Sequence, residues 1–196
     1  MAYFERLWSD LPDATPEQFA LRRDFAISAL AGRARVLDVG CGAGAFSGAF
    51  AQAGFAVAGV DVAAEALRRA RAAFPAIEFV AAGESDLPFA DGSFDGAWIG
   101  EVLEHVQDGL GLLGEVARVL APGGRIAVST PDHGWLLRLR LGLSRRTFER
   151  HFEPRSDHVR FFTRRSLSSL LCAGGFEQIA IRAQRGMLLA TAAAAR

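Results

Sequence analysis

Apolar residues in this chain gather in short runs separated by longer, partly polar segments, and the runs have the length of β-strands. The first run, residues 35–39, lacks the alternation of a strand with one wet face, which indicates a strand buried on both sides. Strands are predicted at 35–39, 56–61, 77–82, 94–100, 125–130, 176–183 and 187–194. Helices are predicted at 45–52, 63–73, 102–120 and 166–173.

The last two predicted strands are joined by a short turn that contains Gly186. So short a connection requires an antiparallel pair, because a parallel pair needs a crossover of about a dozen residues. Helical segments between the earlier strands predict right-handed crossovers and helices on both faces of the sheet. The expected fold class is therefore α/β, a Rossmann-like three-layer α/β/α sandwich. Its seven-stranded, mostly parallel sheet would end in an antiparallel hairpin, with the ligand at the carboxyl ends of the strands.

Residues 1–196 are expected to form a single domain with two additions to the sheet. Residues 1–31 would form an N-terminal helical cap of two helices. The second helix would run from Pro16 to Ala31, with Thr15 as its capping residue. Residues 131–165 form an insert after the fifth predicted strand, which we interpret as a lid over the substrate.

A glycine-rich turn follows the first predicted strand. Gly40, Gly42 and Gly44 can take positive φ and lie against a ligand, and the free amides of the next helix point at the same place. Asp61 ends the second strand about twenty residues past the turn, where a carboxylate can accept both ribose hydroxyls of a nucleotide. The turn also fits G-x-G-x-x-A through Ala45, so alone it leaves a nicotinamide or flavin cofactor open.

Composition limits these alternatives. A dehydrogenase would usually need a further substrate domain, and the predicted elements leave no residues to build one. The apolar content of 51% suits a full three-layer core, and a formal net charge of zero argues against generic nucleic-acid binding. No segment approaches the roughly 18 apolar residues of a membrane span, and no signal peptide opens the chain. Cys41 and Cys172 indicate no disulfide framework. We expect a cytoplasmic protein.

Glu101, Glu104 and His105 follow the fourth predicted strand at the expected ligand edge. If the segment from Glu101 to His105 begins the predicted helix, spacings of three and four residues place the three side chains on one face. Two carboxylates and an imidazole on one face can form a metal site. They can equally stabilise the helix N-terminus through its dipole, with a packed, hydrogen-bonded histidine.

The insert 131–165 is rich in arginine: it contains nine arginines and four acidic residues. Trp135 and several leucines are interleaved with the first arginines. Three interpretations compete, namely a substrate lid, a segment 135–146 that transiently contacts a membrane surface, and a strip that contacts RNA phosphates. A solvated arginine-rich face also fits the distal residues. His133 and His151 are expected to be polar lid residues.

Taken together, five motifs resemble those of class I S-adenosylmethionine-dependent methyltransferases across essentially the whole chain. They are Val36-Leu37-Asp38-Val39-Gly40-Cys41-Gly42-Ala43-Gly44, then Asp61, Leu87-Pro88-Phe89 through Ser93-Phe94-Asp95, Glu101-Val102-Leu103-Glu104-His105-Val106, and Leu120-Ala121-Pro122-Gly123-Gly124. Each motif is modest alone, and their order makes the resemblance specific.

The resemblance implies S-adenosyl-L-methionine as the cofactor. Gly40, Gly42 and the nearby backbone would hold its methionine part, with Asp38 orienting the loop. Asp61 would hold the ribose hydroxyls, and Val62 would pack on the adenine. The family often has an aspartate for the adenine amino group at the position of Gly83, so that contact would pass to Glu84 or Ser85. The implied cofactor-binding residues are Asp38, Gly40, Cys41, Gly42, Gly44, Asp61, Val62, Gly83, Glu84 and Ser85.

The Glu-x-x-Glu-His pattern is similar to that of two metal-using groups of O-methyltransferases. One acts on catechol-type quinone precursors in ubiquinone biosynthesis, and the other on the 2′-hydroxyl at the 3′ end of small RNAs. The second group carries a further histidine in a segment that resembles residues 157–164, which implies His158. The implied metal ligands are Glu101, Glu104, His105 and His158, for Mg, Mn, Fe or Zn. The implied catalytic residues are His105, His158 and Glu101.

We therefore expect O-methylation of a small-molecule hydroxyl, assisted by a divalent metal. Without a metal, His105, His133 or His158 could act as the general base. The alternatives are 2′-O-methylation of RNA, or N- or C-methylation of a small molecule. The expected partner is a small-molecule acceptor, and the sequence leaves the oligomeric state open.

Overall fold

The computed structural model describes residues 5, 8, 15–152 and 158–195, and within these residues seven strands form one sheet. Its order is β3-β2-β1-β4-β5-β7-β6. The strands are β1 (Arg35–Val39), β2 (Ala56–Asp61), β3 (Glu78–Ala81), β4 (Phe94–Gly100), β5 (Leu120–Pro131), β6 (Phe176–Gln184) and β7 (Met187–Ala194). β1 to β5 pair in parallel, and β7 pairs antiparallel with both β5 and β6. The expected fold class is confirmed.

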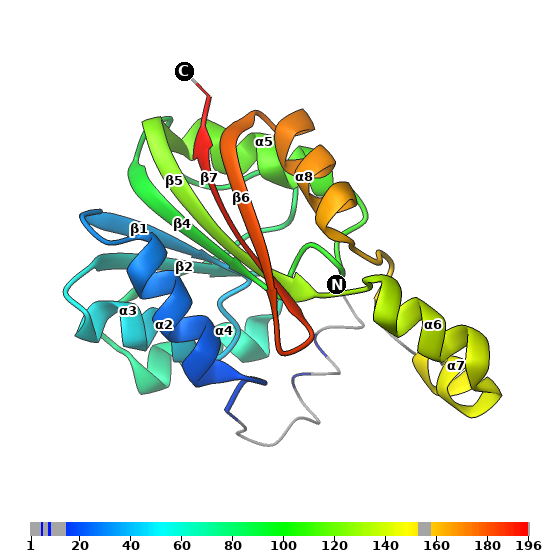
Figure 1. The fold of residues 1–196 in the computed structure, drawn as a ribbon. Coiled ribbons are helices and arrows are strands. Elements are labelled where there is room, and N and C mark those ends of the chain that lie inside the picture. The colour runs from blue at the N-terminus through cyan, green and yellow to red at the C-terminus, as the bar shows by residue number, and fades with distance from the viewer. Residues whose placement is uncertain (1–4, 6–7, 9–14, 153–157, 196) are drawn as a thin grey trace.

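Helices cover both faces of the sheet (Figure 1). One layer contains α2 (Phe19–Ala29), α3 (Ala45–Gln52) and α4 (Ala64–Ala73). The other contains α5 (Gly109–Val119) and α8 (Arg164–Ala173). Chain order alternates between the sheet and these layers, so the carboxyl ends of β1, β2, β4 and β5 meet at one edge.

Neighbouring residues of the central strands point into opposite layers. Val36 and Trp98 pack with Phe50 in the cluster below α2 and α3, whereas Leu37 and Ile99 belong to the cluster that includes α5 and α8. All five side chains are buried. This two-sided burial explains why the strands appear in the sequence as continuous apolar runs.

The predicted start of the helix at 102–120 is wrong. The helix, α5, begins at Gly109, and residues 101–108 form an irregular loop. Glu101 takes a left-handed conformation with φ of 58°, which no helix continues. The carboxylate of Asp108 accepts a hydrogen bond from the amide of Gly111 at 2.8 Å and caps the helix there. Glu101, Glu104 and His105 therefore do not share a helical face.

Two other boundaries differ from expectation. The helix expected from Pro16, with Thr15 as its cap, begins at Phe19, after a left-handed Gln18 with φ of 49°. β5 begins at Leu120 and includes the expected turn at residues 121–124, with a register shift against β4. The helix expected before Pro16 lies outside the described residues, apart from Glu5 and Trp8.

The insert after β5 contains two helices that the sequence did not predict. These are α6 (Trp135–Leu143) and α7 (Arg145–His151), and they contact mainly each other. Figure 1 shows them projecting from the body of the domain beyond the ends of β6 and β7. In the part of the chain that the structure describes, no helix combines the length and apolar character that crossing a membrane requires.

Candidate functional site

The glycine turn lies at the carboxyl end of β1, in the centre of the sheet. Gly40, Gly42 and Gly44 all have positive φ, at 69°, 54° and 83°. A Cβ atom on Gly40 would lie 2.3 Å from Cγ2 of Val102, so the space here requires glycine as well. α3 begins directly after Gly44, and its first amides lack helical partners. Gly40 is exposed, whereas Gly42 is buried, and a Cβ atom there would lie 2.7 Å from the ring of Trp8. The exposed backbone at Gly40, next to a helix N-terminus, suits an anionic or nucleotide ligand.

Asp61 is fixed at the end of β2 beside this turn. Its Oδ2 accepts a hydrogen bond from the amide of Gly42, and its Oδ1 accepts one from the amide of Ala63, each at 2.9 Å. Burial raises the pKa of this carboxyl, and the bonds from both amides oppose that rise. A carboxylate held in this way can accept hydroxyl hydrogen bonds without moving.

Asp38, on β1, is buried and accepts a hydrogen bond from the hydroxyl of Ser47 at 2.5 Å. Burial raises the pKa of Asp38 to about 7. Because Ser47 belongs to α3, this bond ties the strand before the glycine turn to the helix after it. Cys41, within the turn, is also buried, and burial raises the pKa of its thiol.

The residues expected near an adenine follow β2 and β3. A Cβ atom on Gly83 would meet no other atom within 4 Å, so space is open there. The carboxylate of Glu84 accepts a hydrogen bond from the amide of Asp108 at 3.1 Å. Glu84 therefore holds the loop 101–108, a connection that the sequence did not predict. Val62 is half-buried and Ser85 is exposed.

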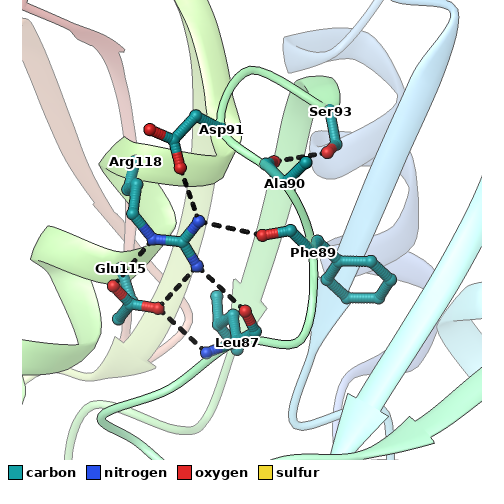
Figure 2. A network of polar contacts seen from close by, with 7 residues as sticks. All are labelled: Leu87, Phe89, Ala90, Asp91, Ser93, Glu115 and Arg118. Atoms are coloured by element: carbon teal, nitrogen blue, oxygen red, sulfur yellow. Dashed lines mark hydrogen bonds and ion pairs between the residues drawn. The ribbon is translucent and has the colours of Figure 1, made fainter.

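The motif around residues 87–93 has a structural role that Figure 2 shows. The guanidinium of Arg118, on α5, donates to the carbonyls of Leu87 and Phe89 at 2.9 and 2.8 Å, and to Asp91 at 2.7 Å. The carboxylate of Glu115 accepts from the same guanidinium at 2.8 Å and from the amide of Leu87 at 2.9 Å. Arg118 thus fastens the turn to α5.

A cluster of three expected site residues lies beyond β4. Glu104, His105 and His158 each offer a ligand atom within 4.8 Å of the others. The hydroxyl of Thr130 donates to Oε2 of Glu104 at 3.0 Å, whereas Oε1 is buried and has no hydrogen-bond partner among the described residues. Burial, and then the charge of Glu101, raise the pKa of Glu104 to about 8. A buried carboxyl oxygen beside two imidazoles fits a divalent cation.

Glu101, expected as a fourth ligand, lies outside this group of three. Its Oε1 accepts a hydrogen bond from the hydroxyl of Ser129 at 3.0 Å, and that hydroxyl accepts one from Nε of Arg22 at 3.0 Å. Arg22 comes from α2, is buried, and lies 4.9 Å from the ring centre of Phe46. Burial raises the pKa of Glu101. The sequence contained no signal for this connection between α2 and the strand ends.

The backbone around His158 is bound to the loop 101–108. The carbonyl of Glu104 accepts hydrogen bonds from the amides of Val159 and Arg160 at 2.8 and 3.1 Å. The side chain of Arg160 donates to the carbonyl of Val106 at 3.0 Å and to that of Gln107. These contacts explain how His158 reaches His105 across a long sequence separation, with ring centres 4.9 Å apart.

The two remaining histidines lie at the base of the insert. His133 is buried, and its ring centre lies 5.1 Å from that of His151 and 5.0 Å from that of Phe161. Burial lowers the pKa of His133. Its amide donates to the carbonyl of Phe162 at 2.8 Å, so His133 packs between the insert and the segment that follows it.

Comparison with known proteins agrees with this geometry. A family described as a methyltransferase domain matches residues 37–128. A demethylmenaquinone methyltransferase of Renibacterium salmoninarum is 38% identical over 108 residues, which cover 55% of this chain and 45% of the relative. A ubiquinone biosynthesis O-methyltransferase of Xanthomonas oryzae pv. oryzae is 40% identical over 102 residues, covering 50% and 43%. The chain thus spans about half the length of the curated relatives it matches.

A solved structure of an S-adenosylmethionine-dependent methyltransferase from Methanosarcina mazei matches with a TM-score of 0.67 and 27% identity. The match covers 86% of this chain and 95% of that one. Residues 37–128 therefore carry a methyltransferase domain, and its fold is similar to that of an S-adenosylmethionine-dependent methyltransferase.

The glycine turn and Asp61 lie where the resemblance to methyltransferases expects the cofactor. The exposed backbone of Gly40, with positive φ, would suit close approach of the methionine part, and the fixed carboxylate of Asp61 would suit the ribose hydroxyls. The family expected from the sequence is confirmed. The contacts of all ten expected residues with the cofactor stay predictions, and so do the roles of the cap and the lid. These residues are Asp38, Gly40, Cys41, Gly42, Gly44, Asp61, Val62, Gly83, Glu84 and Ser85.

Proposed function

We propose that the methyltransferase domain transfers the methyl group of S-adenosyl-L-methionine to a hydroxyl of a small molecule. The observation that carries this proposal is the cluster of Glu104, His105 and His158 at the same edge of the sheet as the glycine turn. A hydroxyl must lose a proton to become a good nucleophile, and this cluster contains groups that can assist. Relatives named O-methyltransferases support the same acceptor class.

In the reaction, an oxygen of the acceptor forms a bond to the methyl carbon as the bond between that carbon and sulfur breaks. S-adenosylhomocysteine is released, and the hydroxyl proton leaves to a base. The main task of the protein is alignment, because the oxygen, the carbon and the sulfur must lie in line. We infer that Asp61 and the glycine turn fix the cofactor, while the loop 101–108 and the segment after His158 fix the acceptor.

Glu104, His105 and His158 would hold a divalent cation, whose contribution when bound is to lower the pKa of a coordinated hydroxyl and to orient it. Glu101 would join them only by releasing the hydroxyl of Ser129. In a reaction without metal, His105 or His158 would accept the proton, a contribution of typically about 10²–10⁴-fold. The pKa of Glu104, at about 8, also suits a proton acceptor near neutral pH.

A transient contact between residues 135–146 and a membrane surface would bring an apolar acceptor within reach of this site. The cytoplasmic location expected from the sequence stays a prediction.

The test is transfer of labelled methyl groups from S-adenosyl-L-methionine to a panel of catechols, hydroquinones, amines and short RNAs. We expect product with a hydroxyl acceptor, lost after treatment with a chelator and restored by one of Mg²⁺, Mn²⁺, Fe²⁺ or Zn²⁺. Glu104→Ala should lower the rate at least tenfold, and Glu149→Ala, an exposed glutamate on α7, should not. Product only with RNA or only with amines would contradict the proposed acceptor.

A further inference from the structure

Exposed apolar side chains gather on one part of this molecule. Eight large apolar side chains are exposed in the described residues, and seven of them lie between residues 135 and 161. They are Trp135, Leu139, Leu143, Phe148, Phe152, Val159 and Phe161. A gathered set of this kind indicates an interaction surface, whereas single exposed apolar residues need no explanation.

Three of these side chains form a stripe along α6, which we call the α6 stripe: Trp135, Leu139 and Leu143. They are 69%, 48% and 78% exposed. Their spacing of four residues places them on one side of the helix, within about 80° of arc at 3.6 residues per turn. By the same geometry Arg138 and Arg140 lie about 60° beyond the two edges of the stripe. Both arginines are exposed.

The hairpin formed by α6 and α7 is strongly cationic. Residues 135–151 contain five arginines, and Glu149 is their single acidic residue. That glutamate is paired with Arg145 at 2.7 Å. An apolar stripe flanked by arginines suits the interface of a bilayer, where the aliphatic side chains enter the acyl region and the guanidinium groups remain among anionic headgroups.

We propose that the α6 stripe docks the methyltransferase domain onto an anionic lipid surface, with α6 lying in the plane of the membrane. A helix of nine residues is about 14 Å long, so it can rest in the interface but not cross it. The hairpin projects from the domain, as Figure 1 shows, and is therefore free to reach a flat surface.

The charges and side chains of the α6 stripe favour a lipid surface over a second copy of the chain or an RNA. A second copy packed stripe to stripe would bring Arg138 and Arg140 toward the same arginines of its partner, with no acidic face to neutralise them. RNA would pair with the arginines and could stack a base on Trp135, but Leu139 and Leu143 offer its bases no further flat ring. Acyl chains bury leucine directly.

Docking through the α6 stripe would also bring the domain close to an acceptor dissolved in the membrane. This part of the inference rests on the proposed function. His133 lies two residues before the start of α6, and His158 of the acceptor cluster follows the hairpin in the chain. The stripe would therefore hold the acceptor side of the domain close to the membrane. An acceptor dissolved in lipid could then reach the cluster without crossing bulk water.

The experiment is flotation of the full chain with two kinds of vesicle, one of phosphatidylcholine and one of phosphatidylcholine with phosphatidylglycerol. The test variant is Leu139→Glu with Leu143→Glu. The matched control is Leu110→Glu on α5, because Leu110 is also 48% exposed but lies outside the hairpin. Binding of S-adenosylhomocysteine, measured by calorimetry, checks that each variant is folded. No acceptor is present, so this test is independent of the proposed reaction.

We expect wild type and Leu110→Glu to float with the anionic vesicles and to remain in solution with the neutral ones. The double variant should lose about tenfold or more of its vesicle affinity, since it removes buried apolar surface and adds two negative charges. Wild type that fails to float with anionic vesicles would overturn the proposal, and so would equal loss in the control or no loss in the double variant. A wild-type dimer that the double variant dissolves, or RNA binding without vesicle binding, would assign the stripe to another occupant and also overturn it.

Discussion

The hydroxyl of Thr130 holds one carboxyl oxygen of Glu104 at 3.0 Å, and the carboxyl group lies within 4.8 Å of ligand atoms on two histidines. Thr130 lies near the end of β5, the strand next to β4, which leads to Glu104. The sheet itself therefore orients this carboxyl. The arrangement of an oriented carboxylate with a supporting hydrogen bond is characteristic of metal ligands.

Removing this carboxyl should weaken metal binding. We expect Glu104→Ala to lower the affinity for Mn²⁺ or Zn²⁺ by more than about tenfold, and Thr130→Val to lower it by about 10–100-fold. Titration calorimetry on the purified protein measures both values. Glu149→Ala is the control, because that carboxylate lies on the exposed hairpin. Equal affinity in all four proteins would mean that the cluster is structural.

The buried carboxyl of Asp38 should make the stability of the domain depend on pH. Its pKa is about 7 in the folded protein, against about 4 for an ordinary aspartate. The folded state keeps a proton that the unfolded chain releases between these values, so the free energy of unfolding falls as the pH rises from about 4 to about 7. The slope from one such group is at most about 1.4 kcal/mol per pH unit.

Asp38→Asn should remove that part of the slope, because the amide oxygen can still accept from Ser47 and carries no charge. Denaturant unfolding at pH 5 and pH 7.5 gives the comparison. We expect the free energy of unfolding to decrease more for wild type than for the variant. Parallel decreases would show that Asp38 does not hold a proton in this range.

Asp61 and Asp95 each accept hydrogen bonds from two backbone amides, but only the loss of Asp61 should weaken binding of the cofactor. Asp61 accepts from Gly42 and Ala63 at the glycine turn, whereas Asp95 accepts from the amides of Ala34 and Arg35 at 2.7 and 2.8 Å, at the opposite end of the strands. We expect Asp61→Ala to weaken binding of S-adenosylhomocysteine by about 1.5–3 kcal/mol, or roughly ten- to hundredfold.

Asp95→Ala is the matched control for this measurement. It should lower the free energy of unfolding by about 1–2 kcal/mol through the loss of its amide contacts, yet leave the affinity of the folded protein unchanged. If both variants bind S-adenosylhomocysteine like wild type, Asp61 has no role in the cofactor site.

The network of Arg118 should contribute to stability and not to binding. Arg118→Ala removes the contacts that join α5 to the turn 87–93, so we expect a loss of about 1–2 kcal/mol in the free energy of unfolding. The expected loss of stability is small for so many contacts, because the side chain of Arg118 is about one third exposed and solvent screens its ion pairs. Arg125→Ala, an exposed position on β5, should change stability by about 0.5 kcal/mol or less. Equal effects would contradict the role of the network.

The sequence predicted those parts of the structure that depend on local pattern. Buried strands such as β1 appear as apolar runs, and the turn at Gly40 and Gly42 is visible because only glycine fits its backbone. Asp61 could be located because a carboxylate at the end of the second strand must lie beside that turn. The final antiparallel hairpin follows from the short connection between its two strands. The order of the strands was not predicted.

Contacts between distant parts of the chain left no such pattern. Arg22 and Ser129 are 107 residues apart, and nothing around either residue indicates the other. The start of α5 was missed because apolar residues continue through the loop 101–108, although Asp108 was present as a capping residue. In α6 five of the nine residues are leucines, and they are spread around the helix. The exposed stripe therefore becomes visible only when the structure shows which side of the helix is covered.

The most direct measurement for the central claim is titration calorimetry of the wild-type protein with S-adenosylhomocysteine and, separately, with a nicotinamide dinucleotide. The glycine turn and Asp61 predict saturable heat with S-adenosylhomocysteine at one site per chain and none with the dinucleotide. Saturable heat with the dinucleotide and none with S-adenosylhomocysteine would contradict the account.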